Sequence, residues 1–200
     1  MNIDLESINP KFIELFRQTF AFTEEEFALF LSRFAVKTIA KKDYFLRAGD
    51  CCHSKAYLNK GCTRNYVIDD QGHERILHFA FEDWWLGDME SYYSGKAAST
   101  YIQMLECSEL LVISKESFLR SEQEIPKLKL WYTHKILRSA SASMNRIVEM
   151  KTLSAELRYL HLLEKQPHIF QRIPLQYIAS YLNIEPQSLS RMRNRLTNKH

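Results

Sequence analysis

The spacing of apolar residues divides the sequence into helical ends and a strand-rich middle. Residues 12–20 and 24–34 have apolar side chains three and four positions apart, which predicts two helices. Thr23, followed three residues later by Glu26, is the capping-box pattern for the start of the second helix. Between residues 36 and 113 short apolar segments alternate with turns, which indicates an antiparallel barrel or sandwich.

Glycine and proline follow the same division. All five glycines lie between residues 49 and 95, and four of the five prolines come after residue 125. Gly72 lies in the turn between segments 63–68 and 73–79, which predicts a β-hairpin. Pro126 suits the first position of a helix, and we expect a long helix from this residue to about residue 150.

This long helix carries a face on which apolar or small residues recur at intervals of three and four. That spacing is close to a coiled-coil seam, and about 25 residues is long for a helix of a small domain. We therefore interpret the face as a dimer seam, with one more core helix as the alternative. The predicted seam comprises Leu128, Tyr132, Ile136, Ala140, Ser143, Ile147 and Met150.

Residues 173–196 have the pattern of two helices joined by a tight turn. The first helix is expected at 175–182, and Asn183 can take the left-handed conformation that ends a helix. Pro186 suits the first position of the second helix. The residues predicted to be buried are Ile178, Ala179 and Leu182 in the first helix and Leu189, Met192 and Leu196 in the second.

The polar face of this second helix has the chemistry needed to read duplex DNA. Arginine can bind guanine O6 and N7 together, and glutamine can pair with adenine N6 and N7. Side chains near the start of a recognition helix reach base edges, whereas other polar groups contact phosphates. We expect base contacts from Gln187, Ser188 and Arg191, further contacts from Ser190 and Asn194, and phosphate contacts from Arg193, Arg195 and Lys199.

The charge distribution agrees with a nucleic-acid surface at one end. The net charge is only +3, but residues 186–200 carry four basic and no acidic residues, whereas the first 30 residues are acidic. A solvated basic helix without a partner is the alternative interpretation. No apolar run approaches the ~18 residues that span a membrane, and the N-terminus lacks a secretory pattern, so we expect a cytoplasmic protein.

The sequence offers no pattern for a metal or a catalytic site. Cys51, Cys52, Cys62 and Cys107 match no zinc or iron–sulfur spacing, so we expect free thiols that pack as small hydrophobic residues. A cupin-like metalloenzyme would require a histidine and carboxylate pattern that is absent around His53, His73, Glu74 and His78. We therefore expect no enzyme activity, no metal and no cofactor.

Three stretches of this sequence resemble the Crp/Fnr family, the cyclic-AMP receptor protein and its relatives. They are N-K-G-C-T-R at 59–64 with G-H-E at 72–74, L-G-D-M at 86–89, and I-A-S-Y-L at 178–182 with Ser190 and Arg191. The resemblance implies an α+β fold with an N-terminal antiparallel β-roll, a long dimerisation helix and a C-terminal winged helix-turn-helix. The corresponding segments are 1–125, 126–150 and 151–200, with a shortened wing before His200.

The same resemblance implies a homodimeric regulator that binds double-stranded DNA, with RNA polymerase as a further partner and no membrane association. Members that bind cyclic AMP have an arginine where this sequence has Ala98, and Lys96 cannot supply the same bidentate geometry. We therefore do not expect cyclic AMP as the ligand. The implied effector pocket comprises Gly87, Asp88, Met89, Ala98, Ser99 and Ser141.

A second interpretation is a β-roll module that senses a ligand or a protein partner without binding DNA. Trp84, Trp85, His73 and His78 could line such a pocket, including one for haem, although aromatic residues in strands are usually packing residues. Binding to duplex DNA that weakens steeply with salt would distinguish a regulator from such a module.

Overall fold

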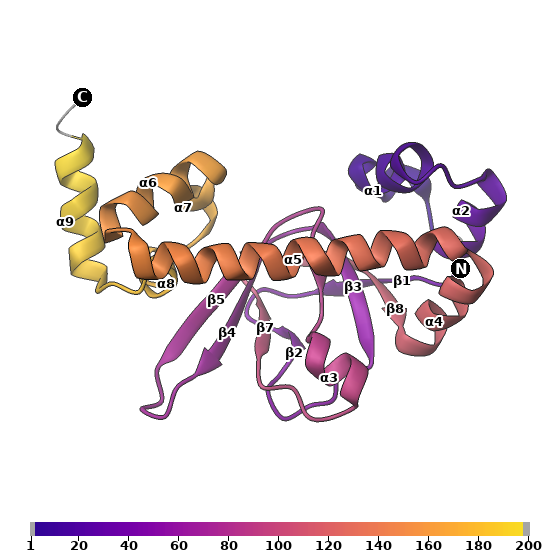
Figure 1. Cartoon of the computed structure of the whole chain (residues 1–200), viewed down its shortest axis with the longest axis horizontal. Helices are drawn as coiled ribbons and strands as arrows, with labels where there is room; N and C mark the ends of the chain where they lie inside the picture. Colours follow the sequence, from indigo (N-terminus) through magenta and orange to yellow (C-terminus); the bar gives the residue numbers. More distant parts are fainter. Residues whose placement is uncertain (1–2, 198–200) are drawn as a thin grey trace. The chain divides into compact units, whose positions relative to one another are not determined.

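The computed structural model describes residues 3–197, and all helices, strands and contacts named in the structure belong to those residues (Figure 1). The chain forms two compact units. Along the sequence, the boundaries between them fall after residues 67, 78 and 135. The first unit holds most of the strands and the N-terminal helices. The second holds the tip of one hairpin and the C-terminal helices.

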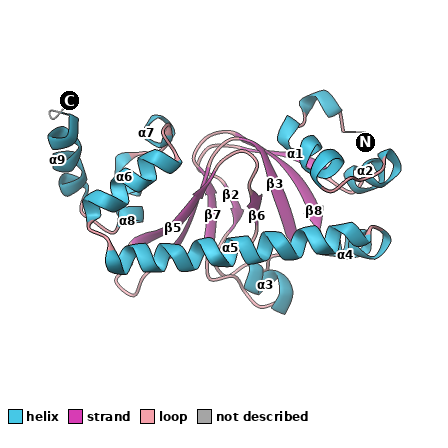
Figure 2. Cartoon of the chain, turned by 45° about the horizontal axis from the view of Figure 1, so that its top comes forward, coloured by secondary structure: helices cyan, strands magenta, loops and turns pink. Residues whose placement is uncertain are grey.

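The strands form two four-stranded sheets, with orders β1-β8-β3-β6 and β2-β7-β4-β5. The pairs β1–β8, β3–β8, β3–β6, β2–β7 and β4–β7 are all antiparallel, which confirms the predicted antiparallel β-roll within an α+β fold (Figure 2). The strands are β1 (Ala35–Ile39), β2 (Tyr44–Leu46), β3 (Ser54–Lys60), β4 (Thr63–Ile68), β5 (Glu74–Ala80), β6 (Trp85–Leu86), β7 (Tyr101–Met104) and β8 (Ser108–Ser114).

The interior of the roll is filled by apolar side chains from both sheets. Strands β3 and β8 of one sheet and strand β7 of the other contribute to the same buried cluster. Burial of such side chains is the main favourable contribution to folding. The cluster includes Ile39, Leu46, Ala56, Leu58, Ile102, Met104 and Leu110.

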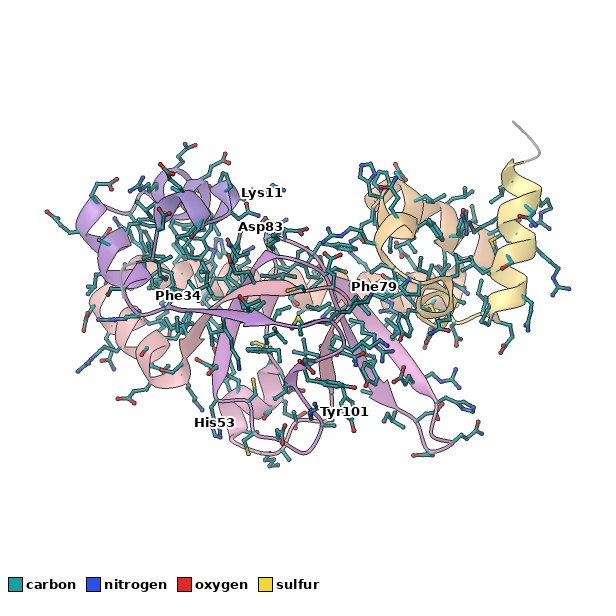
Figure 3. All side chains as sticks on the ribbon, turned by 180° about the vertical axis from the view of Figure 1, so that it is seen from behind. Lys11, Phe34, His53, Phe79, Asp83 and Tyr101 are labelled. Atoms are coloured by element: carbon teal, nitrogen blue, oxygen red, sulfur yellow. The ribbon has the colours of Figure 1, made fainter. Side chains whose placement is uncertain are left out.

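Short helices before the first strand pack on the roll through aromatic rings. They are the 3₁₀-helix η1 (Leu5–Ser7), α1 (Pro10–Glu14), the π-helix η2 (Leu15–Thr19) and α2 (Glu24–Leu31), and the predicted capping box of Thr23 and Glu26 is present. The Phe12 ring centroid lies 4.8 Å from those of Phe16 and Tyr57. The Phe34 ring, labelled in Figure 3, has its centroid 5.8 Å from that of Phe12.

The remaining helices of the first unit are α3 (Met89–Ser94), α4 (Lys115–Glu124) and the start of α5 (Pro126–Thr152). Helix α5 begins at Pro126 as predicted and ends two residues beyond the predicted end. The second unit contains the rest of α5 with α6 (Ala155–Lys165), α7 (Ile169–Arg172), α8 (Leu175–Leu182) and α9 (Pro186–Thr197). The boundaries 1–125, 126–150 and 151–200 stay a prediction.

None of the described helices is long and apolar enough to cross a lipid bilayer. Helix α5, the longest of them at 27 residues, carries charged and polar side chains along most of its length.

Gly61 closes the turn between β3 and β4, and its conformation and surroundings both require glycine. Its φ is +119°, and a Cβ there would lie 2.2 Å from Oγ and 2.9 Å from Cα of Ser108. We expect Gly61→Ala to lower the free energy of unfolding by more than about 2 kcal/mol, since backbone strain and overpacking each cost about 1–3 kcal/mol. Urea unfolding followed by circular dichroism measures this change.

Gly72→Ala is the matched control. Gly72 also has a positive φ, +84°, but a Cβ there would meet nothing within 4 Å. We expect this variant to lose only about 1–2 kcal/mol from backbone strain. Equal losses in the two variants would contradict a role for the Ser108 contact.

Candidate functional site

Helices α8 and α9 form the predicted pair, joined by a three-residue turn. Asn183 is left-handed, with φ 53° and ψ 50°, and the Ile184 N–H donates to the Ala179 carbonyl at 3.0 Å. These two features end α8 and redirect the chain into α9. The predicted buried residues Ile178, Ala179, Leu182, Leu189 and Met192 are all buried, and Leu196 is partly buried.

The face of α9 opposite Leu189 and Met192 points to solvent. Gln187, Arg191 and Asn194 are exposed and lie four and three residues apart, so they line one side of the helix. Ser190 is exposed as well, but its hydroxyl donates to the Pro186 carbonyl one turn earlier.

Ser188 is half-buried and accepts a hydrogen bond from the Arg191 guanidinium at 3.3 Å. This contact joins two of the three residues predicted to contact bases. Helix α9 therefore presents amide, hydroxyl and guanidinium groups together on one side, with no acidic residue among them.

The other arginines of α9 contact neighbouring helices. Arg195 forms an ion pair with Glu156 of α6, and its side chain is 58% exposed. The Arg193 guanidinium carbon lies 4.6 Å from the centre of the Phe170 ring of α7. Both side chains thus help to hold α9 against α6 and α7, a role that sequence reasoning missed. Lys199 lies outside the described residues.

Two arginines hold the end of α8. Arg146 of α5 donates to the Tyr181 carbonyl at 3.0 Å, and its guanidinium stacks on the Tyr181 ring. Arg158 of α6 donates to the Leu182 carbonyl at 3.0 Å and to the Leu153 carbonyl, at the C-terminal end of α5, at 2.6 Å. Cations are favourable at helix C-termini, where carbonyls lack helical partners.

The sequence carried no signal for this pair of arginines. Their acceptors are backbone carbonyls, which every residue type possesses, and the pairing depends on how α5, α6 and α8 pack. We call Arg146 and Arg158 the arginine clamp, because they fix the turn that precedes α9.

The tip of the β4–β5 hairpin belongs to the same compact unit and contacts α8. The Ser180 hydroxyl donates to the Glu74 carbonyl at 3.1 Å and accepts from the Ile76 N–H at 3.2 Å. Arg146 also donates to the Ile76 carbonyl at 3.2 Å. One serine and one arginine therefore join the hairpin tip to the first helix of the pair.

The turn of this hairpin is closed by Asp69, whose carboxylate accepts from the N–H groups of Gln71 and His73 and from the Arg75 guanidinium. These bonds lower the pKa of Asp69 to about 2. His73 is exposed, and its Nδ1 lies 3.5 Å from the Asp69 carboxylate.

Two of the predicted effector residues in the first unit, Asp88 and Ala98, form hydrogen bonds within the chain. The Asp88 carboxylate accepts from the Ser91 N–H at 3.0 Å, capping α3, and from the Thr100 hydroxyl at 2.8 Å. Ala98 is 5% exposed, with its backbone N–H and carbonyl bonded to Asp50 and Gly49.

Segment 87–100 contains no arginine, and the Asp88 carboxylate stands at the start of α3. Gly87 precedes this carboxylate and Met89 follows it, while Ser99 is exposed. Ser141 lies in the other compact unit.

The prediction of a dimer seam is wrong for two of its residues. Leu128 is 0% and Tyr132 is 7% exposed, so both are buried within their own chain and cannot contact a partner. Farther along α5, Ile136 and Met150 are half-buried, while Ala140, Ser143 and Ile147 are exposed. The other exposed apolar side chains of this helix are Leu130, Leu137, Met144 and Val148.

The cysteines are free thiols, as expected, but only two of them pack as small hydrophobic residues. Cys52 and Cys62 are buried, whereas Cys51 and Cys107 are exposed, so the prediction is wrong for the exposed pair. Trp85 packs 5.1 Å from the Trp131 ring centroid, as expected of a core residue.

Comparison with known proteins agrees with this architecture. Residues 36–123 match the family model of the cyclic nucleotide-binding domain. The sequence has no match among curated proteins.

Solved structures of Crp/Fnr regulators share the fold. The c-di-GMP responsive global regulator CLP of Xanthomonas campestris is 16% identical, with a TM-score of 0.71 over 88% of this chain and 93% of its own. FixK2 of Bradyrhizobium japonicum is 11% identical, with a TM-score of 0.73 over 83% and 85%. The Thermus thermophilus Catabolite Activator Protein is 21% identical, with a TM-score of 0.55 over 92% and 87%.

Removing one arm of the arginine clamp tests its role. We expect Arg158→Met to lower the free energy of unfolding by about 1.5–3 kcal/mol, because hydrogen bonds to charged groups are lost and the Leu153 and Leu182 carbonyls lose a donor. Urea unfolding of the whole chain measures the change. Arg191→Met is the matched control and should stay within about 0.5 kcal/mol of the wild type, since Arg191 is exposed. Equal stability of both variants would contradict the clamp.

Proposed function

We propose that this chain, which carries a cyclic nucleotide-binding-type domain at residues 36–123 and has the fold of Crp/Fnr regulators, is a homodimeric transcription regulator that binds specific DNA sequences. The observation that carries the proposal is the solvent face of α9. This helix buries an apolar stripe against its own unit and presents Gln187, Arg191 and Asn194 on one exposed side.

This face has the dimensions and chemistry of a major-groove reader. An α-helix fits the major groove, and the N-terminal part of such a helix reaches base edges. Gln187 and Arg191 lie in the first two turns of α9 and are the residue types that pair bidentately with adenine and guanine. The hydrogen bond from Arg191 to Ser188 orients the guanidinium in the absence of DNA.

Contacts with neighbouring helices restrict the movement of α9. The arginine clamp fixes the end of α8, and the ion pair of Arg195 with Glu156 ties α9 to α6. A helix held in this way favours specific DNA binding, because side chains that are already oriented lose less entropy on binding. Arg193 and Arg195 can turn to phosphates only by exchanging their present partners.

A second copy of the chain is the proposed partner of α5. Leu137 is 62% and Met144 is 60% exposed, one heptad apart on the same helix face, with Ala140 and Ile147 between and after them. Exposed apolar residues at heptad spacing are typical of a coiled-coil seam. Leu130 is also exposed and stands one heptad earlier in the sequence.

The ligand of the β-roll is proposed to be something other than a cyclic nucleotide. The resemblance puts Ala98 where family members that bind cyclic AMP have an arginine, so a buried cyclic phosphate would lose its strongest charge-assisted hydrogen bond here. A small ligand of the β-roll and contact with RNA polymerase stay predictions from the resemblance.

The DNA proposal is tested with duplexes that the wild-type chain selects from a random pool. Fluorescence anisotropy should show binding that weakens steeply between two salt concentrations, from counterion release. We expect Arg191→Ala to lose about 1–3 kcal/mol of preference for the selected over a scrambled duplex, roughly 5- to 150-fold. Arg120→Ala, the same charge change on an exposed residue of α4, is the control and should keep the preference.

Two outcomes would contradict parts of this proposal. If the wild-type chain shows no salt-dependent binding to duplex DNA, the chain is a sensing module without DNA binding. If Arg191→Ala keeps the full preference, the base pairs are read by other residues.

The dimer is tested with Leu137→Glu. We expect this variant to sediment as a monomer at concentrations where the wild type is a dimer, because two carboxylates would face each other across an apolar seam. Leu119→Glu on α4, which is 40% exposed, is the control and should leave the dimer intact. Dimers of equal stability in both variants would place the interface elsewhere.

A further inference from the structure

Lys55 of β3 is a buried lysine without a hydrogen-bond partner. The residue is 3% exposed, and its ammonium has no acceptor in the part of the chain that the structure describes. Lysine is almost never fully buried unless it is paired, because removing the ammonium from water is costly. Its environment therefore requires an explanation.

Aromatic rings surround this ammonium in place of hydrogen-bond acceptors. The Nζ atom lies 3.5 Å from the ring centre of Tyr132 and 4.1 Å from those of Tyr92 and Phe118. The ring of Tyr93 is 5.2 Å away. A cation within about 6 Å of a ring face is attracted by the quadrupole of the ring, and the attraction is larger where water is excluded. We call these four rings the Lys55 cage.

The cage joins separate elements of the first unit. Tyr92 and Tyr93 belong to α3, Phe118 to α4 and Tyr132 to the first turns of α5. Helix α3 starts at Met89, directly after Asp88, and the Tyr132 hydroxyl donates to the Met89 sulfur at 3.2 Å. Lys55 thus lies where the segment of the predicted effector pocket meets the start of the long helix.

Lys55 is the group at this position whose charge changes near neutral pH. Burial lowers its pKa to about 7, an effect that Glu122 and Cys52 oppose and Lys115 reinforces. Burial raises the pKa of Tyr92, Tyr93 and Tyr132, so the rings stay neutral over the same range. Burial also raises the pKa of the Cys52 thiol and of Glu122.

We propose that Lys55 and the rings of Tyr92, Phe118 and Tyr132 form a proton-operated latch between α3 and the first turns of α5. The three rings attract the ammonium and reduce the cost of burying it, but that cost still favours the neutral amine while α3 and α5 are closed around Lys55. An open arrangement in which Lys55 reaches water binds the proton more strongly, so protonation loosens α3 from α5 and deprotonation favours their closure. The latch is therefore tightest at alkaline pH, loosens as pH falls toward about 7, and does not depend on the proposed DNA binding.

The first test follows the titration of Lys55 itself. In protein labelled with ¹³C at lysine Cε, the Lys55 resonance is assigned by its absence in Lys55→Met. We expect its midpoint well below the ordinary value of about 10.4 and ring resonances of Tyr92 and Tyr132 that shift with the same midpoint. A Lys55 midpoint near 10.4, or rings that do not respond, would overturn the latch.

A matched pair at Tyr132 tests the contribution of the ring. Tyr132→Leu removes the ring, so the charged form of Lys55 loses stabilisation and its midpoint falls by about 0.4 to 1.5 pH units. Tyr132→Phe keeps the ring and removes only the hydroxyl, and its midpoint should stay near that of the wild type. Equal midpoints in the two variants would exclude an attraction between the ring and the ammonium.

Stability against pH gives an independent measurement. Because the Lys55 pKa is lower in the folded than in the unfolded chain, the unfolded chain binds more protons between about pH 7 and 10.4, and folding is favoured as pH rises through that window. We expect this rise in urea unfolding of the wild type and of Lys115→Met, a control at the rim of the cage, but not of Lys55→Met. A rise that persists in Lys55→Met would assign the effect to another group.

Discussion

Burial of Leu189 and Met192 determines which side of α9 faces solvent. Their side chains are 0% and 8% exposed, and they leave Gln187, Arg191 and Asn194 on the opposite side. A rotation of α9 about its axis would expose the apolar stripe and bury charged groups without partners, and both changes are costly. The arginine clamp then sets the position of the helix by holding the carbonyls that precede its first turn.

The first unit combines a filled interior with one unusual charge. Apolar side chains from both sheets occupy the centre of the roll, and Asp88 satisfies the start of α3. In the same unit, the Lys55 ammonium contacts aromatic rings and has no hydrogen-bond acceptor among the described residues. The Lys55 cage is therefore the place in this unit where we propose a response to a proton, at the boundary between α3 and α5.

Errors in the sequence interpretation share one cause. A face of α5 was assigned to a partner from its spacing alone, yet Leu128 and Tyr132 pack inside their own chain. The spacing of apolar residues shows that a helix has an apolar face. It does not show whether the same chain or a partner chain covers that face. Likewise, Cys51 and Cys107 are exposed although cysteine is usually buried, because residue type alone does not determine depth.

Local interactions within one segment could be predicted from the sequence. The capping box at Thr23, the left-handed Asn183 and the start of α9 at Pro186 each depend on residues a few positions apart. The tertiary structure alone decided the arginine clamp, the contact of Ser180 with the hairpin tip and the Lys55 cage. Each joins groups that lie tens of residues apart, and their acceptors are backbone carbonyls or ring faces, which have no distinguishing pattern in a sequence.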